Sequence, residues 1–356
     1  MSSKFATKIM DNNKIIGRWL LLGVAMLVVQ VLLGGITRLT GSGLSITEWK
    51  PLLGAIPPMN DVEWDQLFKL YQEKTGQFKY LNNDFTLSDF KFIFFWEWMH
   101  REWARLISIV FLIPFIYFIY KKMITKEMIP KLIGLFILGA AQGLIGWIMV
   151  ASGLNDENLY VTHITLAAHF TSAMVLICFT YWFALSLLIS KNDIVYNQSI
   201  KKWTIGVLIV LFFQLIYGAF MAGLKAATVA PTWPSINGDY FPSAISSQSW
   251  TNHPINIHFF HRTIAYILIL LICFWYTKAL KIKDSILFNK YKWVPLGFVV
   301  VQVLLGIFTV LASTHLTRNG FGLFEYLAQA HQLIAMFLVL SFVWVLSIFK
   351  KAKPKY

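Results

Sequence analysis

The chain has 356 residues, of which 57% are hydrophobic and only 13% charged, which excludes a soluble globular domain, where about a quarter of residues are charged. Several apolar stretches of about 20 residues predict a polytopic helical membrane protein. The net charge of +14 then indicates topology rather than nucleic-acid binding, because basic residues collect in the cytoplasmic connections of membrane proteins.

Eight membrane-spanning helices are predicted, so the expected fold is an all-α polytopic membrane protein. They cover residues 18–37, 92–120, 132–151, 160–190, 203–224, 257–277, 293–312 and 326–349. The segment before the first helix is too polar for the core of a signal peptide, so we expect this helix to be retained. Most basic residues lie in the two terminal segments and in alternate connections, which predicts that both termini are cytoplasmic.

Two of the connections on the opposite, outer side are long. In the first, residues 39–91, apolar side chains recur at helical spacing over 61–80 and predict an amphipathic helix at the membrane interface. The second, residues 225–256, is rich in Pro, Ser, Asn and Trp and predicts irregular structure. Cys178 and Cys273 lie inside apolar runs, which favours buried thiols over a disulfide or a metal pair.

The motif Gln-x-x-x-Gly recurs in every odd-numbered helix. Its copies are Gln30/Gly34, Gln142/Gly146, Gln214/Gly218 and Gln302/Gly306. Four matched copies indicate a duplication, so we expect two tandem pseudo-symmetric four-helix bundles with the same orientation, residues 1–190 and 191–356. The glycines have two interpretations: they allow close helix packing, or they make room for a flat cofactor.

Four histidines repeat in the even-numbered helices. The separation of His100 and His169 in the first half is nearly the same as that of His261 and His331 in the second. Two imidazoles on facing helices are typical of axial haem ligation between apolar walls. Zinc would need three or four ligands, and the methionines show no cluster of the kind that suits copper. Each histidine is expected about 8–14 Å below the outer surface, at 1.5 Å per residue, so the chemistry should lie near the outer face.

Three arginines lie beside these histidines in the sequence. Arg101, Arg105 and Arg262 are candidate partners for haem propionates, because guanidinium binds carboxylate with two parallel hydrogen bonds. The alternative for Arg101 and Arg105 is a pairing with Glu97 or Glu102 along the same helix.

The residue one turn before the histidine differs between the halves. Glu97 precedes His100, whereas His258 precedes His261. A carboxylate beside a haem can take part in acid–base steps or stabilise positive charge, although Glu97 has the alternative of a salt bridge to Arg101. We therefore expect the reaction in the first half and a permanent electron-transfer haem in the second. His258 is a candidate propionate partner or an alternative ligand.

The runs GGITRLTGSGLSITEWKPLLGAIPP (34–58), EWMHREWARL (97–106) and HFFHR (258–262), with the four paired histidines, resemble the haem A synthase family over essentially the whole chain. The first outer loop contains no cysteine, so the chain looks like the alphaproteobacterial and mitochondrial branch.

The resemblance implies an oxidoreductase acting on CH or CH3 groups. It would oxidise a pyrrole methyl group of haem O to the formyl group of haem A, through successive hydroxylations with water as oxygen source, and pass electrons to a bound haem b. His100 and His169 match the substrate-haem site, His261 and His331 match the haem b site, and Glu97 matches the catalytic carboxylate. The product would serve cytochrome oxidase.

The resemblance places the protein in the bacterial inner membrane. Candidate partners are membrane lipid, haem O synthase, assembly factors of cytochrome oxidase and further copies of the chain, with no nucleic acid. Two rival interpretations stand beside it. A dihaem b-type electron carrier gives Glu97 no role and usually places its haems on opposite sides of the membrane, and a haem transporter would tolerate Glu97→Gln.

Overall fold

The computed structural model describes residues 3–48, 53–154, 159–317 and 320–350. Both chain ends lie outside these ranges, as do 49–52 of the first quoted motif and parts of two outer connections, 155–158 and 318–319. Eight helices in the described residues are long and apolar enough to cross a membrane, which confirms the all-α polytopic fold. These are α1 (Ser3–Leu39), α4 (Leu87–Tyr120), α5 (Ile129–Ala151), α6 (His163–Leu188), α7 (Gln198–Gly223), α10 (Pro254–Ala279), α12 (Val294–Leu311, with α11, Ile286–Tyr291, before it) and α13 (Leu323–Ile348).

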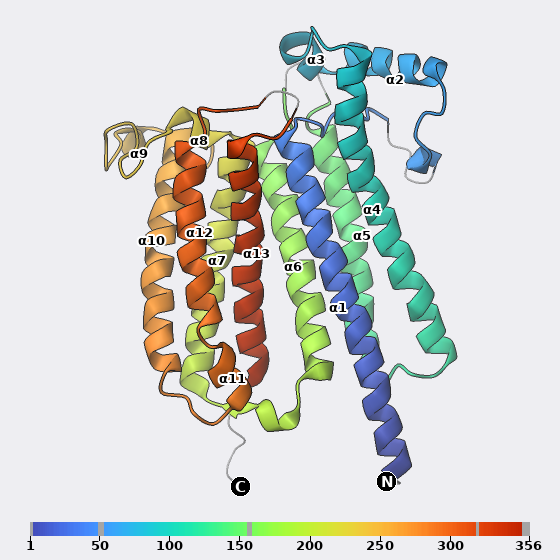
Figure 1. The fold of residues 1–356 in the computed structure, drawn as a ribbon, viewed down its shortest axis with the longest axis vertical. Coiled ribbons are helices and arrows are strands. Elements are labelled where there is room, and N and C mark those ends of the chain that lie inside the picture. The colour runs from blue at the N-terminus through green and yellow to red at the C-terminus, as the bar shows by residue number, and fades with distance from the viewer. Residues whose placement is uncertain (1–2, 49–52, 155–158, 318–319, 351–356) are drawn as a thin grey trace.

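The remaining elements are short. They are η1 (Leu53–Ala55), α2 (Asp61–Lys74), α3 (Gly76–Leu81), η2 (Lys191–Asp193), α8 (Ala226–Val229), α9 (Ala244–Ser247) and the strands β1 (Val195–Tyr196) and β2 (Phe349–Lys350). The strands pair in parallel and tie the segment before α7 to the end of α13. α1 begins and α13 ends at the same end of the bundle, opposite α2 and α3 (Figure 1).

The helix α4 begins at Leu87, ahead of the predicted start of this span. A capping box explains the difference: the Thr86 hydroxyl accepts from the Asp89 backbone N–H, and the Asp89 carboxylate accepts from the Thr86 backbone N–H. The added turns project beyond the other helices and carry α2 and α3 (Figure 1). We call α2 and α3, residues 61–81, the cap, and the end of the bundle where they lie the cap end.

The cap is two helices rather than the single one predicted over 61–80. The break lies at Thr75, whose backbone is extended and whose hydroxyl accepts from the Phe78 N–H to start α3. Tyr71 is fully buried against Phe90 and Phe94 of α4, so aromatic packing holds the cap in place.

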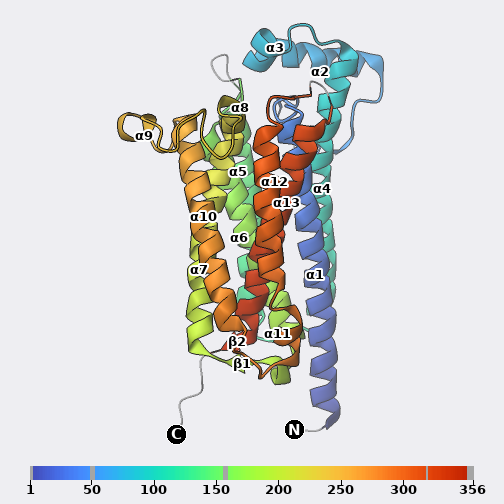
Figure 2. The same cartoon turned by 60° about the vertical axis from the view of Figure 1, so that its left-hand side comes forward.

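The first and last helices of each half form the centre of the molecule. α6 packs against α1, α7 and α13, and α13 packs in turn against α1 and α7. α4 and α5 flank this centre on one side, while α10 and α12 flank it on the other (Figures 1 and 2). Across the centre, the Gln329 and Gln332 side chains donate to the backbone oxygens of Leu32 (3.2 Å) and Val31 (3.1 Å).

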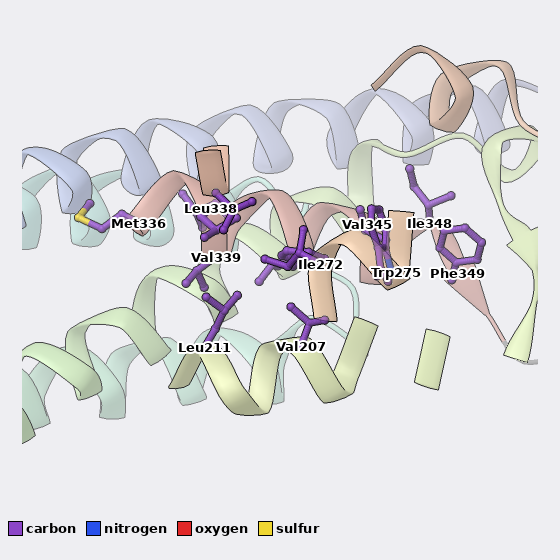
Figure 3. Close-up of a cluster of buried hydrophobic side chains, with 14 of the residues drawn as sticks. Val207, Leu211, Ile272, Trp275, Met336, Leu338, Val339, Val345, Ile348 and Phe349 are labelled. Atoms are coloured by element: carbon purple, nitrogen blue, oxygen red, sulfur yellow. The ribbon is translucent and has the colours of Figure 1, made fainter. Parts of the chain in front are cut away.

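Adjacent helices pack differently in the two halves. In the second half, α7 packs on α10, α10 on α12, α12 on α13 and α13 on α7, which closes a ring. In the first half, α1 packs on α4 and α6, and α5 packs on α6, but α4 and α5 form no comparable packed pair within the described residues. The second ring encloses a dense apolar cluster at the end opposite the cap (Figure 3).

The two cysteines are both free thiols. Cys178 is partly buried, but Cys273 is exposed, so the prediction of two buried thiols is wrong for Cys273. A small polarizable thiol at a lipid-facing position costs little, because its surroundings are as apolar as a protein core.

Candidate functional site

A cavity of about 1200 Å³ runs through both halves of the bundle. All four paired histidines line it, so tertiary structure brings together the side chains that the repeat had singled out. His169, His261 and His331 lie about two turns after the first residues of their helices, in agreement with the expected depth. His100 lies deeper into α4, because that helix starts outside the bundle.

Each of the four motif glycines lies directly against one of the four histidines. An added Cβ would be 3.2 Å from Nε2 of His100 at Gly34, 3.1 Å from Cε1 of His169 at Gly146, 3.3 Å from Cε1 of His261 at Gly218 and 2.9 Å from Cε1 of His331 at Gly306. A side chain at these positions would push the imidazole away. The glycines therefore make room for the histidine ring itself, which differs from the flat cofactor that we had considered and explains why motif and histidine repeat together.

The motif glutamines contact the same histidines. Gln214 Nε2 lies 3.2 Å from Nδ1 of His261, and Gln302 Nε2 lies 3.2 Å from Nε2 of His331. In the first half, Gln30 Nε2 donates instead to the backbone oxygen of His100 at 3.1 Å. Gln142 is the exception, because neither of its buried polar atoms has a partner within the described part of the chain.

The adjacent Gly35 faces α13 of the second half rather than a histidine. An added Cβ there would overlap Oε1 of Gln329 in α13, so a side chain at this position would displace the Gln329 side chain, which donates to the backbone oxygen of Leu32 across the two halves. The Gly34–Gly35 pair thus makes room on two sides of α1, one toward His100 within the first half and one toward the second half.

The second-half histidines fit a haem iron. The ring centres of His261 and His331 are 6.4 Å apart, and two imidazole nitrogens at roughly 2 Å from one iron would place the ring centres about 6 Å apart. In the first half, Nδ1 of His169 is buried without a partner in the described residues. Each half thus brings two histidines to one cavity, which is a donor set of the kind that haem uses.

Glu97 is buried, with 3% of its surface exposed, and it lines the same cavity. One carboxylate oxygen accepts from the Ser45 hydroxyl (2.7 Å) and the Ile46 backbone N–H (2.8 Å), and the other accepts from Arg101 (2.6 Å). The salt bridge to Arg101 therefore forms, and two further donors fix the carboxylate one helical turn from His100. The sequence did not single out Ser45, because its contact with Glu97 joins two distant parts of the chain and leaves no periodic signal.

The arginines lie at the cavity wall, each with protein partners. Arg101 pairs with Glu97 and Arg105 pairs with Glu102, so the helical pairing that was left open is present, and both arginines also line the cavity. Arg262 donates to the backbone oxygens of the loop at 232–235, including that of Thr232 at 2.5 Å.

His258 is completely buried and lines the cavity. Neither ring nitrogen has a hydrogen-bond partner within the described residues, and an unpaired buried polar group costs about 1–3 kcal/mol. Arg38 is a cavity residue that the sequence did not indicate. It donates to the backbone oxygen of Ala222 (3.4 Å) and so reaches from α1 into the second half.

Comparison with known proteins identifies the family of the chain. Residues 17–343 match the model of the COX15-CtaA family, described as cytochrome oxidase assembly protein. The chain is 38% identical to the haem A synthase of Flavobacterium psychrophilum over 96% of its own length and 100% of that protein. It is 36% identical to that of Nitrosomonas eutropha over 96% of each chain, and 38% identical to that of Parvibaculum lavamentivorans over 82% of this chain and 85% of that one. The chain therefore belongs to the COX15-CtaA family of cytochrome oxidase assembly proteins.

Proposed function

We propose that this protein is a haem A synthase, an oxidoreductase that converts the pyrrole methyl group of haem O to the formyl group of haem A. The observation that supports this most directly is the contact of each of the four histidines with a motif glycine in one cavity. With it goes the buried carboxylate of Glu97 one turn before His100, where the second half has His258 before His261. His100 and His169 would hold the substrate haem in residues 1–190, and His261 and His331 would hold haem b in residues 191–356.

Haem b would supply a one-electron redox centre that accepts electrons removed from the substrate. Its ligands sit against Gly218 and Gly306, so their rings are positioned before any haem binds. Arg262 and His258 lie at the cavity wall beside His261. A guanidinium and an unpaired imidazole are suitable donors for haem propionates, and we assign both residues to that role.

Glu97 would be the catalytic residue. Three donors fix its carboxylate one turn from His100, so the carboxylate is held at a defined place beside the histidine. A fixed anion there stabilises positive charge that develops on the substrate as electrons leave, and it can accept a proton from the water that supplies the oxygen. Arg101 and Arg105 would bind the propionates of the substrate haem while orienting the acidic residues.

The topology follows from the same proposal. α1 begins and α13 ends opposite the cap, at the end where the lysine-rich connections also lie (Figure 1). The positive-inside rule then places both termini in the cytoplasm of a bacterium, with the protein in the inner membrane and the haem sites toward the outer face. Haem O synthase, oxidase assembly factors and further copies of the chain are candidate partners in that membrane.

The test is to extract the haems from the purified protein and separate them by chromatography, for wild type, Glu97→Gln and the exposed control Glu63→Gln. We expect haem b with haem O or haem A in wild type and in the control. Glu97→Gln should retain haem b and accumulate haem O or a hydroxylated product without haem A. Two equivalents of haem b alone in all three proteins would show a dihaem electron carrier instead, and normal haem A in Glu97→Gln would exclude Glu97 from the chemistry.

A further inference from the structure

The internal repeat allows the cavity in the two halves to be compared position by position. Alignment of the motif glutamines relates α1 to α7 and α5 to α12, and alignment of the histidines relates α4 to α10 and α6 to α13. Each residue of the first-half helices that lies farther from the cap end than His100 and His169 thus has a counterpart in the second half. The matched pairs that set this register are Gln30 with Gln214, Gln142 with Gln302, His100 with His261, and His169 with His331.

The cavity reaches further from the cap end in the first half. Its lining extends to Trp19 on α1, eleven positions from Gln30, and to Thr180 on α6, eleven positions from His169. On the matching helices of the second half it stops at Leu211 and Leu338, three and seven positions from the corresponding residues. At 1.5 Å per residue, the cavity extends about 16 Å below the histidines in the first half and about 5–10 Å in the second.

Side-chain size at three matched positions explains the difference. The second half has Val207, Val299 and Phe342, all buried in the cluster of which Figure 3 shows a part.

The first half has Gly23, Gly139 and Thr180 at these positions. A Cβ added at Gly23 would meet its nearest neighbour at 4.0 Å, and one added at Gly139 would meet nothing within 4 Å. Close packing between helices therefore does not account for either glycine.

We call this lower part of the first-half cavity the shaft, lined by Trp19, Leu20, Gly23, Phe111, Leu135 and Thr180. Its walls are almost entirely apolar, and its upper end is continuous with the pair His100 and His169. It also opens sideways, because Gly139 and Gly143 line the cavity and yet are exposed on α5, on the side where α4 and α5 do not pack together. A hydrocarbon chain can reach the shaft from the lipid without crossing water.

We infer that the shaft binds the isoprenoid chain of the substrate haem, and that Gly23 and Gly139 determine specificity for that chain. This inference rests on the proposed function. Haem O carries a long isoprenoid chain where haem b has a vinyl group. The first half, which has the shaft, therefore accepts the substrate haem with its chain, and the second half, where Val207, Val299 and Phe342 occupy the matched positions, accepts only haem without the chain. The chain then points away from the cap end, which orients the macrocycle between His100 and His169.

The test uses the full-length protein in detergent with the double substitution Gly23→Val and Gly139→Val. These changes give the first half the residues found at the matched positions Val207 and Val299 of the second half. Valine is at least as compatible with a helix interior as glycine, and an added Cβ meets no atom closer than 4.0 Å at either position. The matched control is Gly206→Val on α7, a helical glycine that also has nothing within 4 Å of an added Cβ but does not line the cavity. Haem O and chain-free protohaem are titrated separately into each protein and followed by absorbance.

The double variant should bind haem O more weakly by a factor on the order of ten or more, because part of the chain loses its apolar site. Protohaem binding at the first site and the resident haem b should match those of wild type and the control. Unchanged haem O affinity would overturn the inference, as would an equal loss of both haems. A tightly held lipid acyl chain, displaced by the valines without any effect on haem O, would show that the shaft is a lipid site.

These outcomes are separate from those that test the reaction. If wild type distinguishes haem O from protohaem through the shaft but makes no haem A, the proposed function fails and the chain site stands. If wild type makes haem A and the valines leave haem O affinity unchanged, the function stands and the chain site fails.

Discussion

The two halves of this protein share one arrangement around their histidines and differ in almost everything beneath it. In both halves a motif glycine makes room for each imidazole, as Gly146 does for His169 and Gly306 for His331. Below that level the second half is packed with large apolar side chains, whereas in the first half the cavity continues past Gly23 to Trp19 before an apolar cluster closes it. The comparison teaches that two halves can keep the same contacts around their paired histidines while the packing beneath them differs. On our proposal, this packing decides which haem enters each half.

A second difference lies one helical turn from the first histidine of each half. Glu97 accepts three hydrogen bonds, whereas its counterpart His258 is buried with no partner in the described residues. A satisfied charge is a fixed electrostatic feature of the protein, but an unpaired donor indicates a ligand group that remains to be bound. On our proposal, the first half carries out the chemistry and the second half holds the cofactor.

The largest expected effect comes from removing a histidine. His261→Ala and His331→Ala should each lose the resident haem completely, because a single remaining imidazole leaves one side of the iron without a protein ligand. His100→Ala should keep that haem and lose turnover. Absorbance of the purified variants measures the retained haem. Retention of haem b in both second-half variants would contradict the assignment of the two sites.

A smaller effect is expected from filling the space beside a histidine. Gly306→Val places carbon atoms against His331, where even a Cβ would lie 2.9 Å from the ring, and should weaken haem b binding by roughly tenfold, equivalent to about 1.4 kcal/mol. Gly146→Val should do the same to the substrate haem at His169 and leave haem b unchanged. Titration of each haem into each variant checks this, and a variant that weakened both sites equally would indicate general misfolding.

A separate prediction concerns the stability of the cap, which packs on α4 of the first half. Burial raises the pKa of the Tyr71 phenol to about 12, against the opposing hydrogen bond from Asn82. Because the folded-state pKa lies above the ordinary value of about 10, Tyr71 contributes stability fully below pH 10 and loses it between pH 10 and 12, by about 3 kcal/mol in total.

An ultraviolet difference titration of wild type against Tyr71→Phe measures this pKa directly. Ionisation of Tyr71 near pH 10 would show that the cap does not pack against Phe90 and Phe94 as described. Removal of the hydroxyl should also abolish the alkaline loss of stability in the cap, while the packing of its ring remains.

Sequence patterns were sufficient for the eight spans, since the match between apolar length and bilayer thickness is a local property. They failed at helix ends where side chains cap the backbone, as at Thr86 and Thr75. They were sufficient for the four histidines because duplication repeats them at nearly equal spacing. Sequence patterns did not indicate Ser45 and Arg38, because the contacts of these two residues join parts of the chain that are far apart.

The sequence by itself was enough to predict the eight membrane-spanning helices and to identify the glutamines, glycines and histidines that repeat. Only the tertiary structure decided what the repeated glycines are for, because a glycine's role depends on the neighbour its missing side chain would meet. It also decided that Gly23 and Gly139 border open space while Val207 and Val299 fill theirs. A cavity is the space left between several helices, and no single helix carries the information that it exists.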